Sequence, residues 1–194
     1  MGTPWFALQT RPRNEKRVEF LLTQKGYECF LPTYKQQRRW SYRMVEVVLP
    51  LFPMYIFCRF DEMACGKAIL TPGVIRIVGF GGHPTEVPIK EIEALQLLNG
   101  SDLLREPWAY LPNGTLIQVE TGPLAGVQGV LCSVGDRRHL VVSINLLQRS
   151  VAVHLDDDTM LSVVEVKKEK PKKEKNLSYY ESELAMMLVK KARS

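Results

Sequence analysis

The stretch from Leu49 to Phe60 constrains the fold most, because a strand pattern of aromatic and β-branched residues follows two prolines. Prolines are excluded from the inside of a central ladder, so the strand is expected to begin at Met54. Successive side chains alternate between two faces, one carrying Tyr55, Phe57 and Arg59 and the other Met54, Ile56, Cys58 and Phe60. Both faces are largely apolar. One is expected to face a core, and the other needs a helix, a second domain or another protein over it.

The chain of 194 residues is 45% hydrophobic and 24% charged, which is typical of one ordinary globular domain or two small ones. Its longest apolar stretch, Val47–Cys58, is too short and too rich in proline to span a membrane. The N-terminus lacks the pattern of a secretory signal. Four cysteines without CxxC spacing predict reduced, buried thiols, so we expect a cytoplasmic protein.

The net charge of +5 is unevenly distributed. Residues 1–105 carry 14 Lys and Arg against 10 Asp and Glu, a net +4. Residues 106–165 carry 3 against 7, a net −4, and residues 166–194 carry 9 against 4, a net +5. This distribution does not fit one uniform surface for nucleic acid.

The first region, residues 4–105, predicts an α+β domain. Strand patterns alternate with three helix patterns, in the order strand, helix, strand, strand, helix, strand, helix. Asn14 is a candidate N-cap of the first helix and Gly26 its expected stop. Such an order favours helices packed on a mainly antiparallel sheet.

Four cations gather where the first helix begins: Arg11, Arg13, Lys16 and Arg17. Basic clusters of this size are usually a solvated helix end. Cations are nevertheless disfavoured at a helix N-terminus by its dipole, and a phosphate partner would remove that conflict. From the residues alone, both interpretations stay open. A second basic segment, Lys35–Arg43, contains two aromatics and predicts a hairpin tip, for which no specific partner is the favoured interpretation.

The remaining chain divides into four parts. Residues 106–112 are a predicted linker, and residues 113–165 carry five short strand patterns separated by turn signals, which fits a small barrel. Residues 166–176 form a Lys-rich linker. Residues 177–193 predict an amphipathic helix that begins at a capping box, although a frayed tail is an equal alternative.

No catalytic or metal-binding motif stands out. The three histidines are far apart in sequence, and none has a cysteine or carboxylate at metal-ligand spacing. Asp156, Asp157 and Asp158 lack the glycine and the distal glutamate of a calcium loop. We therefore expect no enzyme, no cofactor and no metal.

The motifs taken in order resemble the NusG family. Trp5–Leu8 followed by a basic helix, then Phe52–Phe57, then Thr71–Val74 with Gly79-Phe80 are similar to the NusG N-terminal domain. Residues 114–131 resemble the KOW motif of that family's SH3-like barrel. Met54 departs from the glycine that housekeeping members have, and the run from Leu49 looks closer to specialised paralogues of the RfaH and UpxY types.

The resemblance implies a bacterial transcription elongation and antitermination factor that reduces pausing and termination, on selected operons such as surface-polysaccharide clusters. It implies RNA polymerase, through its clamp helices, as partner of the N-terminal domain, and a ribosomal protein or Rho as partner of the barrel. The implied polymerase-binding residues are Tyr55, Phe57, Phe52, Pro53 and Ala7. Arg11 and Arg17 fall where specialised members contact non-template DNA, beside Arg13 and Lys16.

Two hypotheses follow. The first is this polymerase-bound factor, with the aromatic sheet face left free for polymerase or masked by the acidic barrel until polymerase arrives. The second is a KOW protein that acts on ribosomes or RNA in assembly or translation. The net charge of −4 on the barrel favours a basic protein partner over RNA.

Overall fold

The computed structural model describes residues 3–61, 65–111 and 113–164, which all belong to one compact unit, Met1–Val164. The predicted Lys-rich linker 166–176 and the amphipathic helix 177–193 lie outside the described residues. Within the described part of the chain, no helix is long and apolar enough to cross a membrane.

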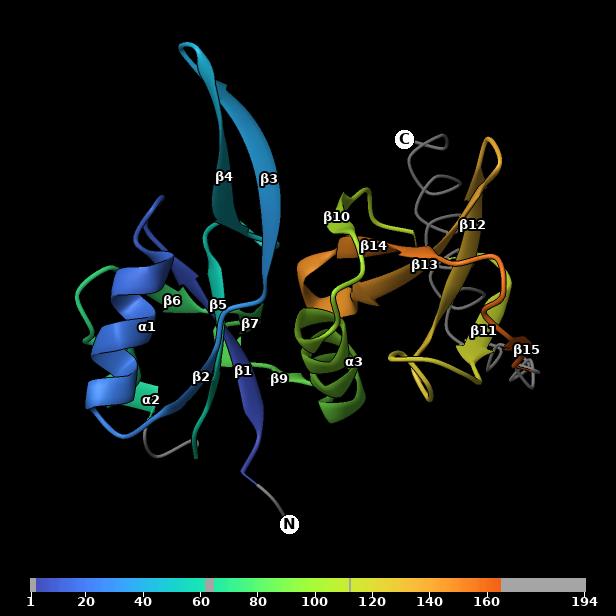
Figure 1. Cartoon of the computed structure of the whole chain (residues 1–194). Helices are drawn as coiled ribbons and strands as arrows, with labels where there is room; N and C mark the ends of the chain where they lie inside the picture. The colour runs from blue at the N-terminus through green and yellow to red at the C-terminus, as the bar shows by residue number, and fades with distance from the viewer. Residues whose placement is uncertain (1–2, 62–64, 112, 165–194) are drawn as a thin grey trace, which may run out of the picture. The chain divides into compact units, whose positions relative to one another are not determined.

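An antiparallel sheet forms the centre of the N-terminal region (Figure 1). Its strand order is β2-β5-β1-β6, and β9 also pairs with β1. The bounds are β1 Trp5–Thr10, β2 Glu28–Phe30, β5 Tyr55–Arg59, β6 Val74–Ile77 and β9 Glu86–Val87. The strand that the prolines were expected to delimit is therefore β5, which lies between β1 and β2 with Ala7 opposite Phe57.

Among the described residues, three helices accompany this sheet: α1 Glu15–Gln24, α2 Cys65–Ile69 and α3 Ile89–Gly100. Asn14 precedes α1, but its side chain donates to the carbonyl of Pro12 instead of capping the helix, which corrects the predicted cap. Gly26, at φ 86°, ends the helix as predicted. Its N–H bonds to the Thr23 carbonyl and that of Tyr27 to the Leu22 carbonyl, a Schellman motif.

Each face of the sheet belongs to its own cluster of buried side chains. Phe6, Leu8, Ile56 and Cys58 share one cluster with Val18 and Leu22 of α1. Trp5, Ala7, Phe52 and Phe57 share the other with Ile92, Leu95 and Leu98 of α3. The prediction of two apolar faces, and of an α+β organisation around them, is confirmed.

A long two-stranded hairpin leaves this sheet (Figure 1). It consists of β3 Thr33–Trp40 and β4 Arg43–Pro50, paired over their whole length. Ser41, with φ 58°, and Tyr42 form the turn, so the predicted basic tip is largely strand. A second, short hairpin joins β7 Gly79–Phe80 to β8 His83–Pro84.

The following region forms a six-stranded antiparallel sheet, here called the second sheet, with the order β10-β14-β13-β12-β11-β15. Its bounds are β10 Arg105–Trp108, β11 Leu116–Val119, β12 Gln128–Val134, β13 Arg137–Ile144, β14 Arg149–Leu155 and β15 Leu161–Val163. A 3-10 helix, η2 Asn145–Leu147, joins β13 to β14. All five predicted strands are present.

The sixth strand, β10, differs from the prediction, because it lies largely in the segment expected to be a linker. It pairs with β14, placing Glu106 opposite Ala152 and Pro107 opposite Val151. Proline argued against a strand, but β10 is at the edge of the sheet, where a missing N–H costs no central ladder bond.

Candidate functional site

The five predicted polymerase-binding residues lie together around β1 and β5. Ala7 pairs directly with Phe57, and the ring of Phe52 meets that of Phe57 edge-on at a centroid distance of 5.7 Å. The ring of Phe30, in β2, stacks on that of Phe57 at a centroid distance of 6.3 Å. The sheet register and the turn before β5 thus gather these residues into one aromatic patch, called the aromatic face below.

The aromatic face is not free, which corrects the expectation of an open surface. Ala7 and Phe57 are fully buried and Phe52 is 1% exposed, whereas Tyr55 is half-buried and Pro53 exposed. The same buried cluster continues through α3 into the second sheet, with Ile117, Leu140, Val142, Ile144, Val151 and Val153. The face is therefore part of one buried cluster that also contains α3 and the second sheet.

Polar contacts accompany this apolar cover. The guanidinium carbon of Arg149, in β14, lies 5.3 Å from the centroid of the Tyr55 ring, which is cation–π geometry. The Asn145 amide donates to the Glu91 carboxylate of α3 at 2.8 Å. Burial raises the pKa of Glu91, while the bond from Asn145 opposes that rise. These contacts orient the second sheet against the N-terminal region.

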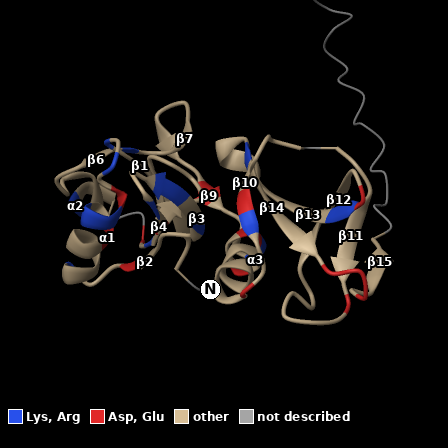
Figure 2. Cartoon of the chain, turned by 45° about the horizontal axis from the view of Figure 1, so that its top comes forward, with Lys and Arg blue, Asp and Glu red and all other residues tan. Residues whose placement is uncertain are grey.

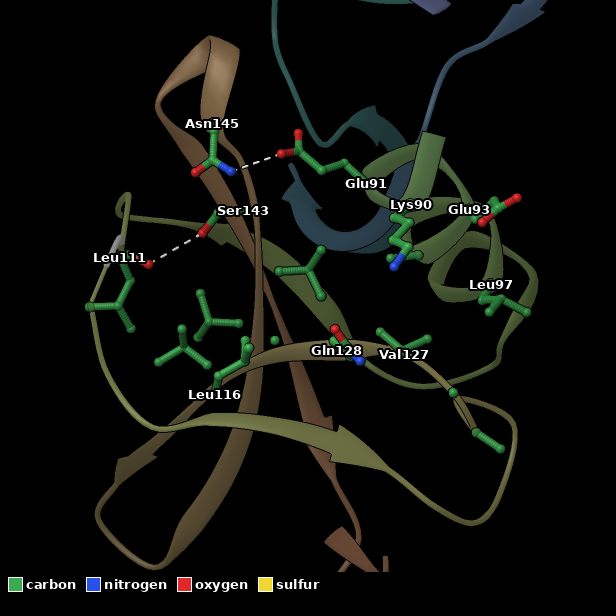
Figure 3. A pocket seen from close by; sticks show the side chains of 17 residues that line it. Lys90, Glu91, Glu93, Leu97, Leu111, Leu116, Val127, Gln128, Ser143 and Asn145 are labelled. Atoms are coloured by element: carbon green, nitrogen blue, oxygen red, sulfur yellow. Dashed lines mark hydrogen bonds between the residues drawn. The ribbon is translucent and has the colours of Figure 1, made fainter. Parts of the chain in front are cut away.

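A cavity of about 560 Å³ lies where α3 meets the second sheet (Figure 3). Lys90, Glu93 and Leu97 line it from α3, and Leu116, Val127 and Gln128 from the second sheet. The pocket is open to solvent, so the contact between α3 and the second sheet is interrupted along this part of the seam.

The predicted DNA-binding cations lie just before α1 and in its first turn. Figure 2 shows Lys and Arg positions in blue on this helix. Arg11, Arg13, Lys16 and Arg17 are all exposed. Glu15, in their midst, is buried and accepts a bond from the backbone N–H of Met54 at 2.8 Å. The basic cluster is thus fastened to the turn that precedes β5, next to the aromatic face.

The hairpin carries a second set of exposed side chains. Trp40 is 70% exposed and Tyr42 fully exposed, with Met44 beside them and Arg38, Arg39 and Arg43 also exposed. Lys35 pairs with Glu46 across the hairpin at 3.1 Å. Aromatic rings without cover at a loop tip have no core function.

Of the four cysteines only Cys58 is buried, which corrects the expectation for the other three. Cys29 and Cys58 face each other across β2 and β5 with their sulfurs 3.5 Å apart. Their hydrogen bond lowers the pKa of Cys29, and that bond together with burial raises the pKa of Cys58.

Sequence reasoning missed one group of side chains. His139 and His154 are distant in sequence, but the β13–β14 ladder places them directly opposite each other. Glu106 of β10 completes the group, with one possible ligand atom from each residue within 4.8 Å of the others. The strand patterns that contain both histidines were recognised, so a prediction of their pairing register would have found this group.

A comparison with family models decides the relationship of the N-terminal region. Residues 3–96 match the family "NusG: Transcription termination factor nusG". This range contains the whole N-terminal sheet, the aromatic face and the basic cluster. Residues 3–96 are a NusG family domain.

One solved structure agrees with this assignment at the level of the fold. The chain is similar to a structure described as "Domain interaction in Thermotoga maritima NusG", with 21% identity and a TM-score of 0.50, over 78% of this chain and 92% of that one. Two conformations of an MjSpt4:Spt5 complex match with 17% and 15% identity over 82% of this chain and 96% and 97% of theirs. Their TM-scores of 0.29 and 0.30 carry no structural argument.

The NusG domain has a physical peculiarity at the start of β5. Met54 has a φ of 70°, a left-handed conformation that glycine adopts without strain and methionine does not. The carbonyl of Met54 accepts from the Thr10 N–H at 2.8 Å, and its own N–H donates to Glu15. The turn that presents the aromatic face is therefore strained and held from both sides.

Proposed function

We propose that this protein is a bacterial transcription elongation and antitermination factor that binds the clamp helices of RNA polymerase through the aromatic face. The observation that supports it is this face itself, built by the NusG domain from Ala7, Phe52, Pro53, Tyr55 and Phe57. Clustered aromatic anchors are what protein interfaces use as hot spots. Binding reduces pausing and termination, and it acts on selected operons.

The covered face is the resting state in this proposal. Polymerase gains access when the second sheet separates from the NusG domain. The open pocket beside α3, which interrupts the contact between them, supports a cover that can separate. The Thermotoga maritima NusG structure is described as a domain interaction in that protein. We extend this idea to the present chain, with Arg149 over Tyr55 as the polar part of the cover.

The second sheet acts as a KOW, SH3-like barrel in this proposal. It takes a ribosomal protein or Rho as its partner once released. The net −4 of residues 106–165 supports a basic protein as that partner. The exposed cluster Arg11, Arg13, Lys16 and Arg17 contacts phosphates of non-template DNA beside the docked aromatic face.

Site-specific crosslinking tests this function in the full chain. A photoreactive residue replaces Pro53, which is the exposed member of the aromatic face. The matched control replaces Val163, which is 67% exposed in β15. We expect position 53 and not position 163 to crosslink to RNA polymerase in elongation complexes. If position 53 captures ribosomal components and no polymerase, the protein is the ribosome- or RNA-associated alternative.

A further inference from the structure

Three chemistry-bearing side chains meet on one face of the second sheet. His139 of β13 pairs with His154 of β14. Glu106 of β10 lies opposite Ala152, which is two residues from His154 and therefore on the same face of β14. Figure 2 shows adjacent acidic and basic positions on β10, next to β14. The register of three strands, and not a loop, fixes this group.

His139 is the most enclosed of the three, with 4% of its surface exposed. Its ring stacks on Trp108 at a centroid distance of 5.4 Å and meets the ring of His154 at 4.3 Å. Its Nδ1 atom is buried and has no hydrogen-bond partner among the described residues. Buried polar atoms are nearly always paired, so this nitrogen calls for a ligand.

The other two members are open to solvent. The Glu106 side chain is 50% exposed, and its Oε1 lies 4.0 Å from Nε2 of His154. Burial lowers the pKa of His154, the neighbouring His139 and Arg137 act in the same direction, and Glu106 opposes them. A neutral imidazole is the form that donates a lone pair to a metal.

We propose that His139, His154 and Glu106 bind a divalent transition metal, with Zn²⁺ as the preferred ion. Two imidazoles and one carboxylate are a ligand set that Zn²⁺ accepts, whereas Ca²⁺ and Mg²⁺ require oxygen ligands. The candidate ligand atoms of the three residues lie up to 4.8 Å apart. A rotation of the half-exposed Glu106 side chain toward the ion would bring its carboxylate closer to the two imidazoles. Three protein ligands leave a fourth position open to solvent.

The metal would tie β10 to β13 and β14. This strand begins at Arg105, whose guanidinium donates to the carbonyl oxygens of Thr33 and Ser101 at 2.8 Å each. A filled site would therefore stiffen the junction between the NusG domain and the second sheet. That role is independent of whether the protein binds polymerase.

Titration of the full chain, without a histidine tag, with Zn²⁺ alone against a competing chelator tests the site. We expect saturable binding of a single equivalent and, with Co²⁺, the visible absorption of a low-coordinate site. His154→Gln and Glu106→Gln should each bind at least about tenfold more weakly. The controls are His83→Gln, an exposed histidine of β8, and Cys29→Ser, which removes one of the two facing thiols. Both should bind as the wild type does.

Three results would overturn the proposal: no saturable Zn²⁺ binding by the wild-type chain, full affinity in His154→Gln, or loss of binding in Cys29→Ser. Hydrogen exchange gives a second readout. Zn²⁺ should slow exchange at the amides of β10 in the wild-type chain and in His83→Gln, but not in His154→Gln. Equal protection in His154→Gln would also contradict the site.

Discussion

At the scale of single residues, the aromatic face depends on the turn before β5. Met54 has a left-handed backbone there, and two hydrogen bonds, to Glu15 and from Thr10, fix its peptide groups. The buried Glu15 carboxylate couples this turn to the basic cluster at the start of α1. One local structure, the turn before β5 together with Glu15, therefore positions both the aromatic face and the basic cluster.

Substitution of Met54 by glycine tests the strain in this turn. Relief of the left-handed conformation is worth about 1–2 kcal/mol, and the extra entropy of glycine in the unfolded chain offsets about 0.5–1 of it. We expect Met54→Gly to leave the free energy of unfolding unchanged or raise it by up to about 1.5 kcal/mol. Met44→Gly, within β4, is the control and should lower it. A clear loss in Met54→Gly, measured by denaturant titration, would contradict the strain.

Removal of two exposed cations tests the DNA contact. We expect Arg11→Ala with Arg17→Ala to weaken binding to elongation complexes and to reduce the salt dependence, because fewer counterions are released. Arg38→Ala with Arg39→Ala removes two exposed hairpin cations and serves as the matched control. If the variant with Arg11→Ala and Arg17→Ala binds elongation complexes with wild-type affinity at low salt, the basic cluster is only a solvated helix end.

At the scale of elements, β10 connects the two sheets. Its first residue, Arg105, also donates to the Asn99 carbonyl at 3.2 Å and, more weakly, to the Leu103 carbonyl at 3.5 Å, so it bonds four carbonyl oxygens of the preceding region. Burial lowers the pKa of Arg105. A guanidinium fork is suited to several carbonyls at once, which lysine's single ammonium is not.

Loss of this anchor should loosen the junction. We expect Arg105→Ala to lower the free energy of unfolding by about 1–3 kcal/mol, because partly buried carbonyls lose a charged donor, and to speed hydrogen exchange in β10. Arg138→Ala, whose guanidinium bonds the carbonyls of Asp156 and Asp157 in an exposed turn, is the control and should change exchange only there. If hydrogen exchange in β10 is unchanged in Arg105→Ala, the pairing of β10 with β14 alone holds the junction, and the Arg105 bonds do not contribute.

How far the sequence predicted the structure differs between elements. Strand period and proline placement predicted β5 and its two apolar faces, because these are local properties. β10 was missed because an edge strand tolerates Pro107, so the local signal pointed to a linker. The cover over Phe57 and the meeting of His139 with His154 depend on pairing between distant segments, which local patterns do not contain.

At the scale of the molecule, charge favours the closed cover, whereas the pocket beside α3 interrupts the contact that holds it. The N-terminal 105 residues carry +4 and residues 106–165 carry −4, so the two regions attract each other. The open pocket at the seam interrupts part of that contact. In the proposed function, polymerase competes with the cover, so we expect its apparent affinity to be reduced in proportion to the fraction of molecules that are open.

The affinity of RNA polymerase for three full-length forms tests this central claim most directly. Arg149→Ala removes the cation–π contact over Tyr55, worth about 0.5–2 kcal/mol, and should bind polymerase at least about twofold more tightly than the wild type. Tyr55→Ala loses an anchor of the face and should bind about tenfold or more weakly. Wild-type affinity in both variants would contradict a polymerase-binding face held closed by the second sheet.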